Sequence, residues 1–156
     1  MDTQKLEKIT ECKLLGITLT NTLSFEKNTE IIVKRAFTRM LILRKLSEFG
    51  IPINDMINIY ILYIRSVAEQ SCVVWHSSLT EEQIMDIERT QKVALRIILQ
   101  EHYETYQNAL NLTKLETLSS QRKTLCLRFA QSCLKSEYNL DMFPMNTKPV
   151  NTRKAT

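Results

Sequence analysis

Glycine and proline are scarce in this chain of 156 residues, which contains two glycines and three prolines. Because sheet-rich folds need many tight turns, this scarcity argues against a β-rich domain and favours long helices joined by short loops. Long apolar runs are also missing. Residues 57–64, the most apolar segment, fall far short of the roughly 20 residues that span a bilayer. We therefore expect one mainly helical domain that does not cross a membrane.

Aspartate is scarce too, and no two aspartates are adjacent in the sequence: Asp2, Asp55, Asp86 and Asp141. Two-metal chemistry, such as nucleotide polymerisation, needs clustered carboxylates. No aspartate lies in a strand-turn-strand pattern that would build such a cluster. We therefore expect a chain that is not an enzyme, with no catalytic residue of its own.

Cysteine and histidine do not form a compact cluster. Spacings of four residues (Cys72 and His76) and seven residues (Cys126 and Cys133) could each share a helix face, but no C-x2-C motif exists. Scattered cysteines, including Cys12, are usually reduced core residues. No apolar leader follows the N-terminus. We expect an intracellular protein of the cytoplasm or nucleus, with no metal and no cofactor.

The clearest element is a helix over Glu81–Leu99. Thr80 and Gln83 form a capping-box pattern, and apolar residues then recur at helical spacing. The same reasoning predicts further helices over 25–49, 54–73, 106–112 and 118–135, the second apolar nearly all round and therefore central. Residues 7–10 and 13–19 read as a short hairpin. The fold class is thus a bundle of four long helices and one short one, with an N-terminal β-hairpin and a disordered tail over 145–156.

Aromatic residues near the middle of the chain have two interpretations. Trp75 and His76 follow the second helix and precede Thr80, so they form a corner. They could stack on a nucleic-acid base. A lone tryptophan at a helix junction more often fills the core and donates its indole N–H to a backbone carbonyl. We favour this structural role for the corner, and a core position for Tyr60 and Tyr63.

The net charge of +4 permits an anionic partner without requiring one. The basic residues of interest lie on two predicted helices: Lys34, Arg35, Arg39, Arg44 and Lys45 on the first, and Arg89, Lys92 and Arg96 on the third. They could bind phosphates. Helices also prefer acids at their starts and bases toward their ends without any ligand. Charge alone favours this second reading.

Several motifs resemble the region that follows the catalytic domain in reverse transcriptases of jockey-like non-LTR retrotransposons. Arg65 precedes the corner W-H-S-S-L (75–79), and E-R-x-Q-K-x-A-L-R-I-I-L (88–99) follows. Leu15, Gly16 and Ile17 match the hairpin that closes the palm near the primer terminus. Later matches are Tyr106, Ala109, Leu110, Thr117, Leu118, Leu125, Cys126, Phe129 and Ala130. The resemblance covers about residues 9–144, although Gln100 stands where the family often has glycine.

The resemblance implies an organisation and a function. Residues 1–22 correspond to the end of the palm, 23–79 to thumb-like helices and 80–144 to a post-thumb segment. The thumb grips the template-primer duplex, so the implied partners are an RNA–DNA or DNA duplex and a reverse-transcriptase palm. The family's aspartate pair precedes the hairpin and lies outside this chain. We expect a non-catalytic fragment of an RNA-directed DNA polymerase. A helical protein-protein interaction module and an inert retroelement relic are the alternatives.

Overall fold

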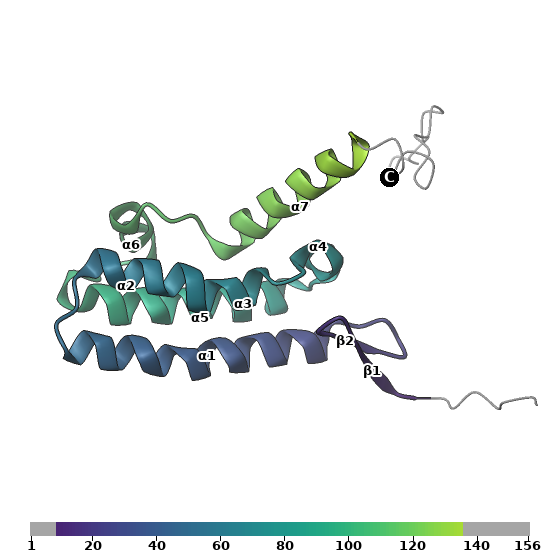
Figure 1. The fold of residues 1–156 in the computed structure, drawn as a ribbon, viewed down its shortest axis with the longest axis horizontal. Helices are drawn as coiled ribbons and strands as arrows, with labels where there is room; N and C mark the ends of the chain where they lie inside the picture. Colours follow the sequence, from purple (N-terminus) through teal and green to yellow (C-terminus); the bar gives the residue numbers. More distant parts are fainter. Residues whose placement is uncertain (1–8, 136–156) are drawn as a thin grey trace, which may run out of the picture.

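Two long helices, α1 (Glu26–Glu48) and α5 (Glu81–Leu99), lie side by side in the computed structural model, which describes residues 9–135 (Figure 1). After α5, Gln100 donates a hydrogen bond to Ser47 near the end of α1. At the other end of the pair, Thr29 and Gln83 line one cavity. The two helices therefore run parallel, with residues about 53 positions apart at the same height.

An antiparallel helix packs against both of them. It consists of α2 (Ile53–Ile59), a π-helical turn η1 (Tyr60–Arg65) and α3 (Ser66–Glu69). Its buried residues include Met56, Tyr60 and Ile64. Arg65 and Glu69, four residues apart on this helix, form an ion pair at 2.6 Å.

The predicted helix over 54–73 was wrong at its end. The structure breaks it after Glu69, where Ser71 has a φ of 53°, and a short α4 (Cys72–Trp75) and η2 (His76–Ser78) follow. The break has a tertiary cause. Trp75 is fully buried, and its indole N–H donates to the Gln70 carbonyl at 3.1 Å, in place of a helical backbone N–H. The predicted structural role of Trp75 is confirmed.

Two clusters of buried side chains form the core. The first joins α1, α2, η1, α5 and α6 (Tyr106–Thr113) around Met40, Leu43, Met56 and Ile98. The second joins the hairpin, α1, α3, α4, α5 and α7 (Leu118–Leu134) around Ile17, Ile32, Trp75, Ile87 and Leu118. Helix α5 contributes to both clusters, which explains why it is the most regularly patterned helix in the sequence.

The predicted hairpin exists, but its strands were placed wrongly. β1 (Glu11–Leu14) pairs antiparallel with β2 (Ile17–Thr20), with Leu14 opposite Ile17. Leu15 and Gly16 form the turn, and both have positive φ, at 48° and 86°. Two-residue hairpin turns require this geometry. The sequence interpretation placed the turn at residues 11–12 instead. Residues 7 and 8 lie outside the described range.

Threonine caps begin the remaining helices. Thr80 and Gln83 form the predicted capping box at α5, with both reciprocal bonds present. After η3 (Gln100–His102), Thr105 caps α6 (Tyr106–Thr113), and Thr117 caps α7 (Leu118–Leu134). Each cap accepts a bond from a backbone N–H that the helix leaves free.

Helix α7 rises away from the bundle (Figure 1). Leu118 and Arg122 in its first turns are buried, whereas Leu127, Phe129 and Leu134 are 56%, 54% and 49% exposed. Burial on this helix is therefore confined to its first turns, because α4 and α5 cover only its beginning.

The fold class is as predicted, mainly helical with an N-terminal hairpin. The predicted tail over 145–156 lies outside the described residues. Within the described range, no helix is long and apolar enough to cross a membrane.

Candidate nucleic-acid interface

The basic stretches of α1 and α5 lie beside each other. Residues 32–46 contain no acid, and neither do residues 90–99. Because the two helices run parallel with an offset near 53 residues, these stretches stand at the same height. All eight predicted basic residues are at least partly accessible, and seven are exposed: Lys34, Arg35, Arg44, Lys45, Arg89, Lys92 and Arg96. The structure thus places the two basic patterns at the same height on neighbouring helices, and we refer to these eight residues together as the basic band.

Three of these residues line one hollow. Lys34, Arg35 and Arg39 surround a concavity of about 450 Å3 with Ile31, Thr38 and Tyr63, and no acidic side chain lines it. The Arg39 guanidinium carbon lies 4.5 Å from the centre of the Tyr63 ring, and its Nη1 donates to the Tyr63 carbonyl. Arg39 is therefore held in place by the π-helical turn. We refer to this concavity as the basic hollow.

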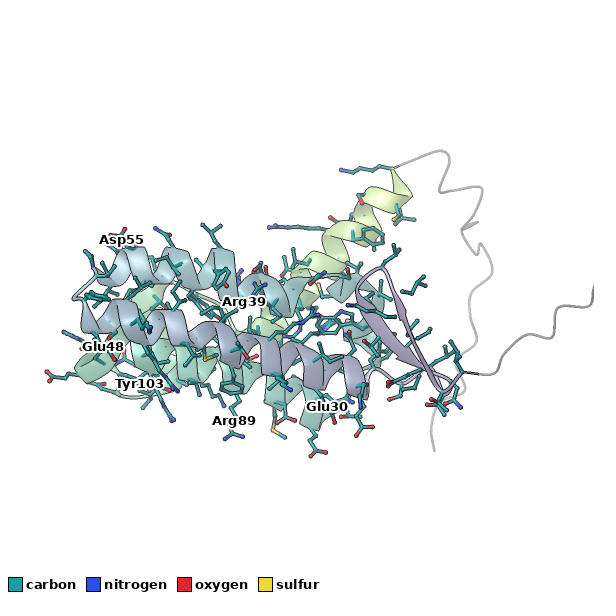
Figure 2. All side chains as sticks on the ribbon, turned by 60° about the horizontal axis from the view of Figure 1, so that its bottom comes forward. Glu30, Arg39, Glu48, Asp55, Arg89 and Tyr103 are labelled. Carbon is teal, nitrogen blue, oxygen red and sulfur yellow. The ribbon has the colours of Figure 1, made fainter. Side chains whose placement is uncertain are left out.

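Two other basic residues lie over tyrosine rings elsewhere. The Lys92 ammonium is 5.2 Å from the Tyr106 ring centre, and the Arg96 guanidinium carbon is 5.2 Å from that of Tyr103. Figure 2 shows Arg39 on the side of α1 that faces the antiparallel helix, and Tyr103 on the other side. Arg39 therefore lies against η1, whereas Lys92 and Arg96 lie against tyrosines at and before the start of α6.

The parallel helix starts enclose an acidic hollow of about 690 Å3. Its lining includes Glu26 and Glu30 from α1, Glu82 and Asp86 from α5, and Lys34. Carboxylates here favour the positive ends of both helix dipoles. They also repel phosphates, so this end of the bundle is a poor surface for nucleic acid. The basic band begins where the acidic hollow ends.

The three hairpin residues do not share one surface. Leu15 is 89% exposed at the turn, whereas Ile17 is buried against α1 and α3. A Cβ on Gly16 would approach Nε2 of Gln70 within 3.3 Å. The backbone N–H of Thr18 donates to Oδ1 of Asn28 at 3.2 Å, which fixes the hairpin on α1. Leu15 and Gly16 are both exposed at the turn, so two of the three residues are placed to contact a partner directly.

The Trp75-His76 corner packs under α7. The Nε–H of Arg122 donates to Nδ1 of His76 at 3.4 Å, and its guanidinium carbon lies 5.8 Å from the Trp75 ring centre. Burial, together with the charges of Arg122 and Lys123, lowers the pKa of His76. The neutral imidazole that accepts this bond is therefore favoured at neutral pH. Trp75 is therefore part of the interior, and His76 is partly buried beside it.

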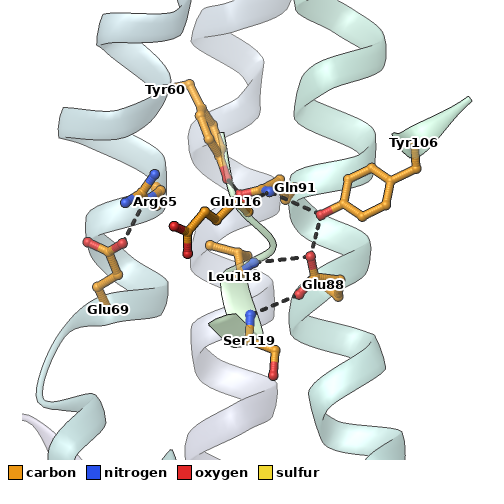
Figure 3. A network of polar contacts seen from close by, with 9 residues as sticks. All are labelled: Tyr60, Arg65, Glu69, Glu88, Gln91, Tyr106, Glu116, Leu118 and Ser119. Carbon is orange, nitrogen blue, oxygen red and sulfur yellow. Dashed lines mark hydrogen bonds and ion pairs between the residues drawn. The ribbon is translucent and has the colours of Figure 1, made fainter. Parts of the chain in front are cut away.

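A polar network connects α5 with its neighbours (Figure 3). The Tyr60 hydroxyl donates to Oε1 of Gln91 at 2.7 Å, and Nε2 of Gln91 reaches the Tyr106 oxygen at 3.0 Å and the Glu116 carbonyl at 2.8 Å. Tyr106 in turn donates to Glu88. Burial raises the pKa of Tyr60, and burial with the Glu88 bond raises that of Tyr106. Both phenols keep their protons at neutral pH, so the network stabilises the fold.

Metal and thiol chemistry have no support within residues 9–135. No group of three metal-binding side chains occurs there. Burial raises the pKa of Cys72 to about 11, which keeps the thiol protonated and unreactive at neutral pH. The expectation of buried cysteines holds for Cys72 and was wrong for Cys12, which is exposed on β1. The aspartates within this range, Asp55 and Asp86, lie on different helices.

Tyr63 is the site residue that sequence reasoning missed. The helix that carries it is apolar nearly all round, so it was predicted to lie in the core. The structure leaves Tyr63 46% exposed and Leu62 76% exposed, while Tyr60 is buried as predicted. Periodicity gave no signal for this exposure, because Tyr63 lies three residues after Tyr60 and seven after Met56, spacings that place it on the buried face of an α-helix.

Comparisons of the chain with protein-family models, with curated proteins and with solved structures find no match. The fold and the geometry of the basic band therefore carry the functional argument, together with the sequence resemblance described above.

Proposed function

We propose that this protein is a non-catalytic, nucleic-acid-binding helical module whose basic band contacts the phosphate backbone. The supporting observation is the alignment of two acid-free basic stretches on the parallel helices α1 and α5. A preference of isolated helices for bases near their ends explains Lys45 and Arg96, which lie near helix ends. It does not explain Lys34 and Arg35 in the first half of α1, nor Arg89 in the middle of α5.

The sequence resemblance makes the proposal more specific. In a non-LTR retrotransposon reverse transcriptase this part would be the end of the palm, the thumb and the post-thumb segment. It would grip an RNA–DNA or DNA duplex and contact the palm, inside the cell. Leu15, exposed at the tip of the hairpin, is the residue best placed to face a palm. The catalytic aspartates would then belong to the palm, so we propose no polymerase activity for this chain.

Salt-dependent binding tests the proposal. An RNA–DNA hybrid should bind the chain more weakly as salt rises, since each neutralised phosphate contributes about 0.7–0.9 to the slope of log K against log salt. A flat slope, or no binding at low salt, would overturn the proposal. Primer extension with Mg2+ or Mn2+ should give no product, and template-dependent synthesis would contradict the non-catalytic assignment.

Matched variants identify the surface. Lys34→Gln with Arg35→Gln, and separately Arg89→Gln with Arg96→Gln, should each weaken binding and reduce the salt slope by about one for every lost phosphate contact. Lys114→Gln, at the end of α6 and away from the band, is the control and should bind as the unchanged chain does.

A protein-protein interaction module is the second candidate, and α7 is the reason for considering it. Leu127 and Leu134 are exposed seven residues apart, on one face of a helix that extends beyond the bundle, and Phe129 is exposed on another face of it. Such surfaces often mark contacts with other proteins. Sedimentation and capture by an intact reverse-transcriptase palm test it. Leu127→Ser with Phe129→Ser should abolish any association found, without changing nucleic-acid affinity. A chain that binds neither duplex nor protein would be the inert relic.

A further inference from the structure

The basic hollow combines two kinds of surface that a nucleic-acid backbone does not need together. Lys34, Arg35 and Arg39 supply three cations at its lining, and Ile31 and Tyr63 supply apolar surface. A phosphate uses the cations alone. Since Tyr63 is 46% exposed, the hollow leaves nearly half of an aromatic side chain accessible beside three positive charges.

The Arg39 guanidinium lies over the Tyr63 ring, and we refer to this stacked pair as the Arg39-Tyr63 platform. The guanidinium lies 4.5 Å from the ring centre, and its bond to the Tyr63 carbonyl restricts its rotation. Nucleic-acid bases stack on aromatic rings and on arginine planes, and this stacking is available only to bases that are not already stacked in a duplex. The volume of about 450 Å3 lies within the roughly 300–1,000 Å3 of small-molecule sites.

We infer that the basic hollow holds one unpaired nucleotide of a single-stranded nucleic acid. The base lies against the Arg39-Tyr63 platform, and the adjoining phosphates lie against Lys34 and Arg35. A blunt duplex cannot fill the hollow, because its bases remain stacked inside the helix. This inference rests on the proposed nucleic-acid function and adds that the module prefers single-stranded segments.

An oligonucleotide without bases distinguishes base stacking on the Arg39-Tyr63 platform from phosphate binding by Lys34 and Arg35. Anisotropy titrations at one low salt concentration would compare three labelled probes: a short single strand, an abasic strand of equal length and a blunt duplex. The single strand should bind most tightly. Tyr63→Leu, which removes the ring and keeps an apolar side chain, should weaken the single strand about 5-fold or more and leave the abasic strand unchanged.

Three variants complete the design. Tyr63→Phe keeps the ring and should bind as the unchanged chain does. Arg39→Gln should weaken binding of both the single strand and the abasic strand, because it removes a cation as well as part of the platform. Tyr103→Leu alters the other arginine-tyrosine pair, which lies outside the basic hollow, and should leave the ratio of single-strand to abasic-strand affinity unchanged.

The outcomes distinguish this inference from the proposed function. Suppose that duplex binding depends on salt but the single strand is not preferred, or that Tyr63→Leu leaves the affinity for the single strand unchanged. Either result overturns the inference and leaves the proposed function standing. No salt-dependent binding to any probe overturns both. If Tyr63→Leu weakens the affinity for all three probes equally, the inference is also overturned, because the ring would then act only by stabilising the fold.

Discussion

Arg122 donates its Nε–H to Nδ1 of His76, while its Nη1 and Nη2 are buried without a hydrogen-bond partner among the described residues. This guanidinium is 0% exposed in the contact between α7 and the bundle. Burial lowers its pKa, although the nearest carboxylate charge, that of Glu88, opposes the change. A buried cation with two unpaired nitrogens costs stability, and this cost can be measured.

Replacing Arg122 by methionine should stabilise the protein. Methionine keeps the unbranched apolar stem and removes the unpaired nitrogens, so we expect a gain of about 1–3 kcal/mol in the free energy of unfolding. Urea denaturation measures it. Arg128→Met, on the exposed side of the same helix, is the control and should change stability by about 0.5 kcal/mol or less. A large loss of stability in Arg122→Met would mean that the guanidinium has a stabilising partner.

Stability should fall as His76 takes up a proton. The pKa of His76 is lowered in the folded state by burial and by Arg122 and Lys123, so the unfolded chain binds the proton more readily. The free energy of unfolding should therefore be constant above about pH 6.5 and decrease below it, until the folded state is protonated too.

The other histidine provides the control for this pH dependence. His76→Gln should remove the decrease, whereas His102→Gln, near the Leu99 carbonyl and away from α7, should keep it. Trp75, the only tryptophan, reports the unfolding by fluorescence. A decrease that persists in His76→Gln would assign it to other groups.

Glu88 should prove to anchor α7. Its two oxygens accept the backbone N–H groups of Leu118 and Ser119, each at 3.1 Å, at the positive end of the helix. Glu88→Gln places an amide donor against a backbone donor, so we expect a loss of about 1.5–3 kcal/mol. Hydrogen exchange at these two amides measures the local effect. Glu101→Gln, an exposed carboxylate, should leave their protection unchanged.

The capping box of α5 should stabilise the folded state by an amount typical of helix N-caps. Thr80→Ala removes the oxygen that accepts the Gln83 N–H at 3.3 Å and should cost about 1 kcal/mol. Thr80→Ser keeps that oxygen and should cost almost nothing. Equal stability of the alanine and serine variants in thermal unfolding would show that the cap contributes little.

Local rules predicted the elements whose signals are local. The bounds of α5 follow from the Thr80 cap and an apolar period that one buried face imposes. The break after Glu69 and the exposure of Phe129 depend instead on tertiary packing: Trp75 is buried in the second core cluster and takes the carbonyl of Gln70, and the bundle ends before α7 does. No pattern within either helix contains that information.

The sequence predicted which basic residues belong to the candidate site, but it did not predict the basic hollow that three of them line. Periodicity places Lys34 and Arg35 on an accessible part of α1, and the structure agrees. The basic hollow also includes Tyr63, which was predicted to be buried because the helix that carries it is apolar nearly all round. It depends as well on a π-helical turn that the sequence did not predict. The alignment of Arg89 with α1 needs the parallel packing of two helices separated by more than thirty residues.

That parallel packing also gives the molecule a permanent polarity. The amino ends of α1 and α5 both point to the acidic hollow, and the cations lie farther along the same axis. A polyanion in solution therefore exerts a torque on the protein before the two touch. Encounters would begin already oriented, and added salt would slow productive association by weakening this alignment.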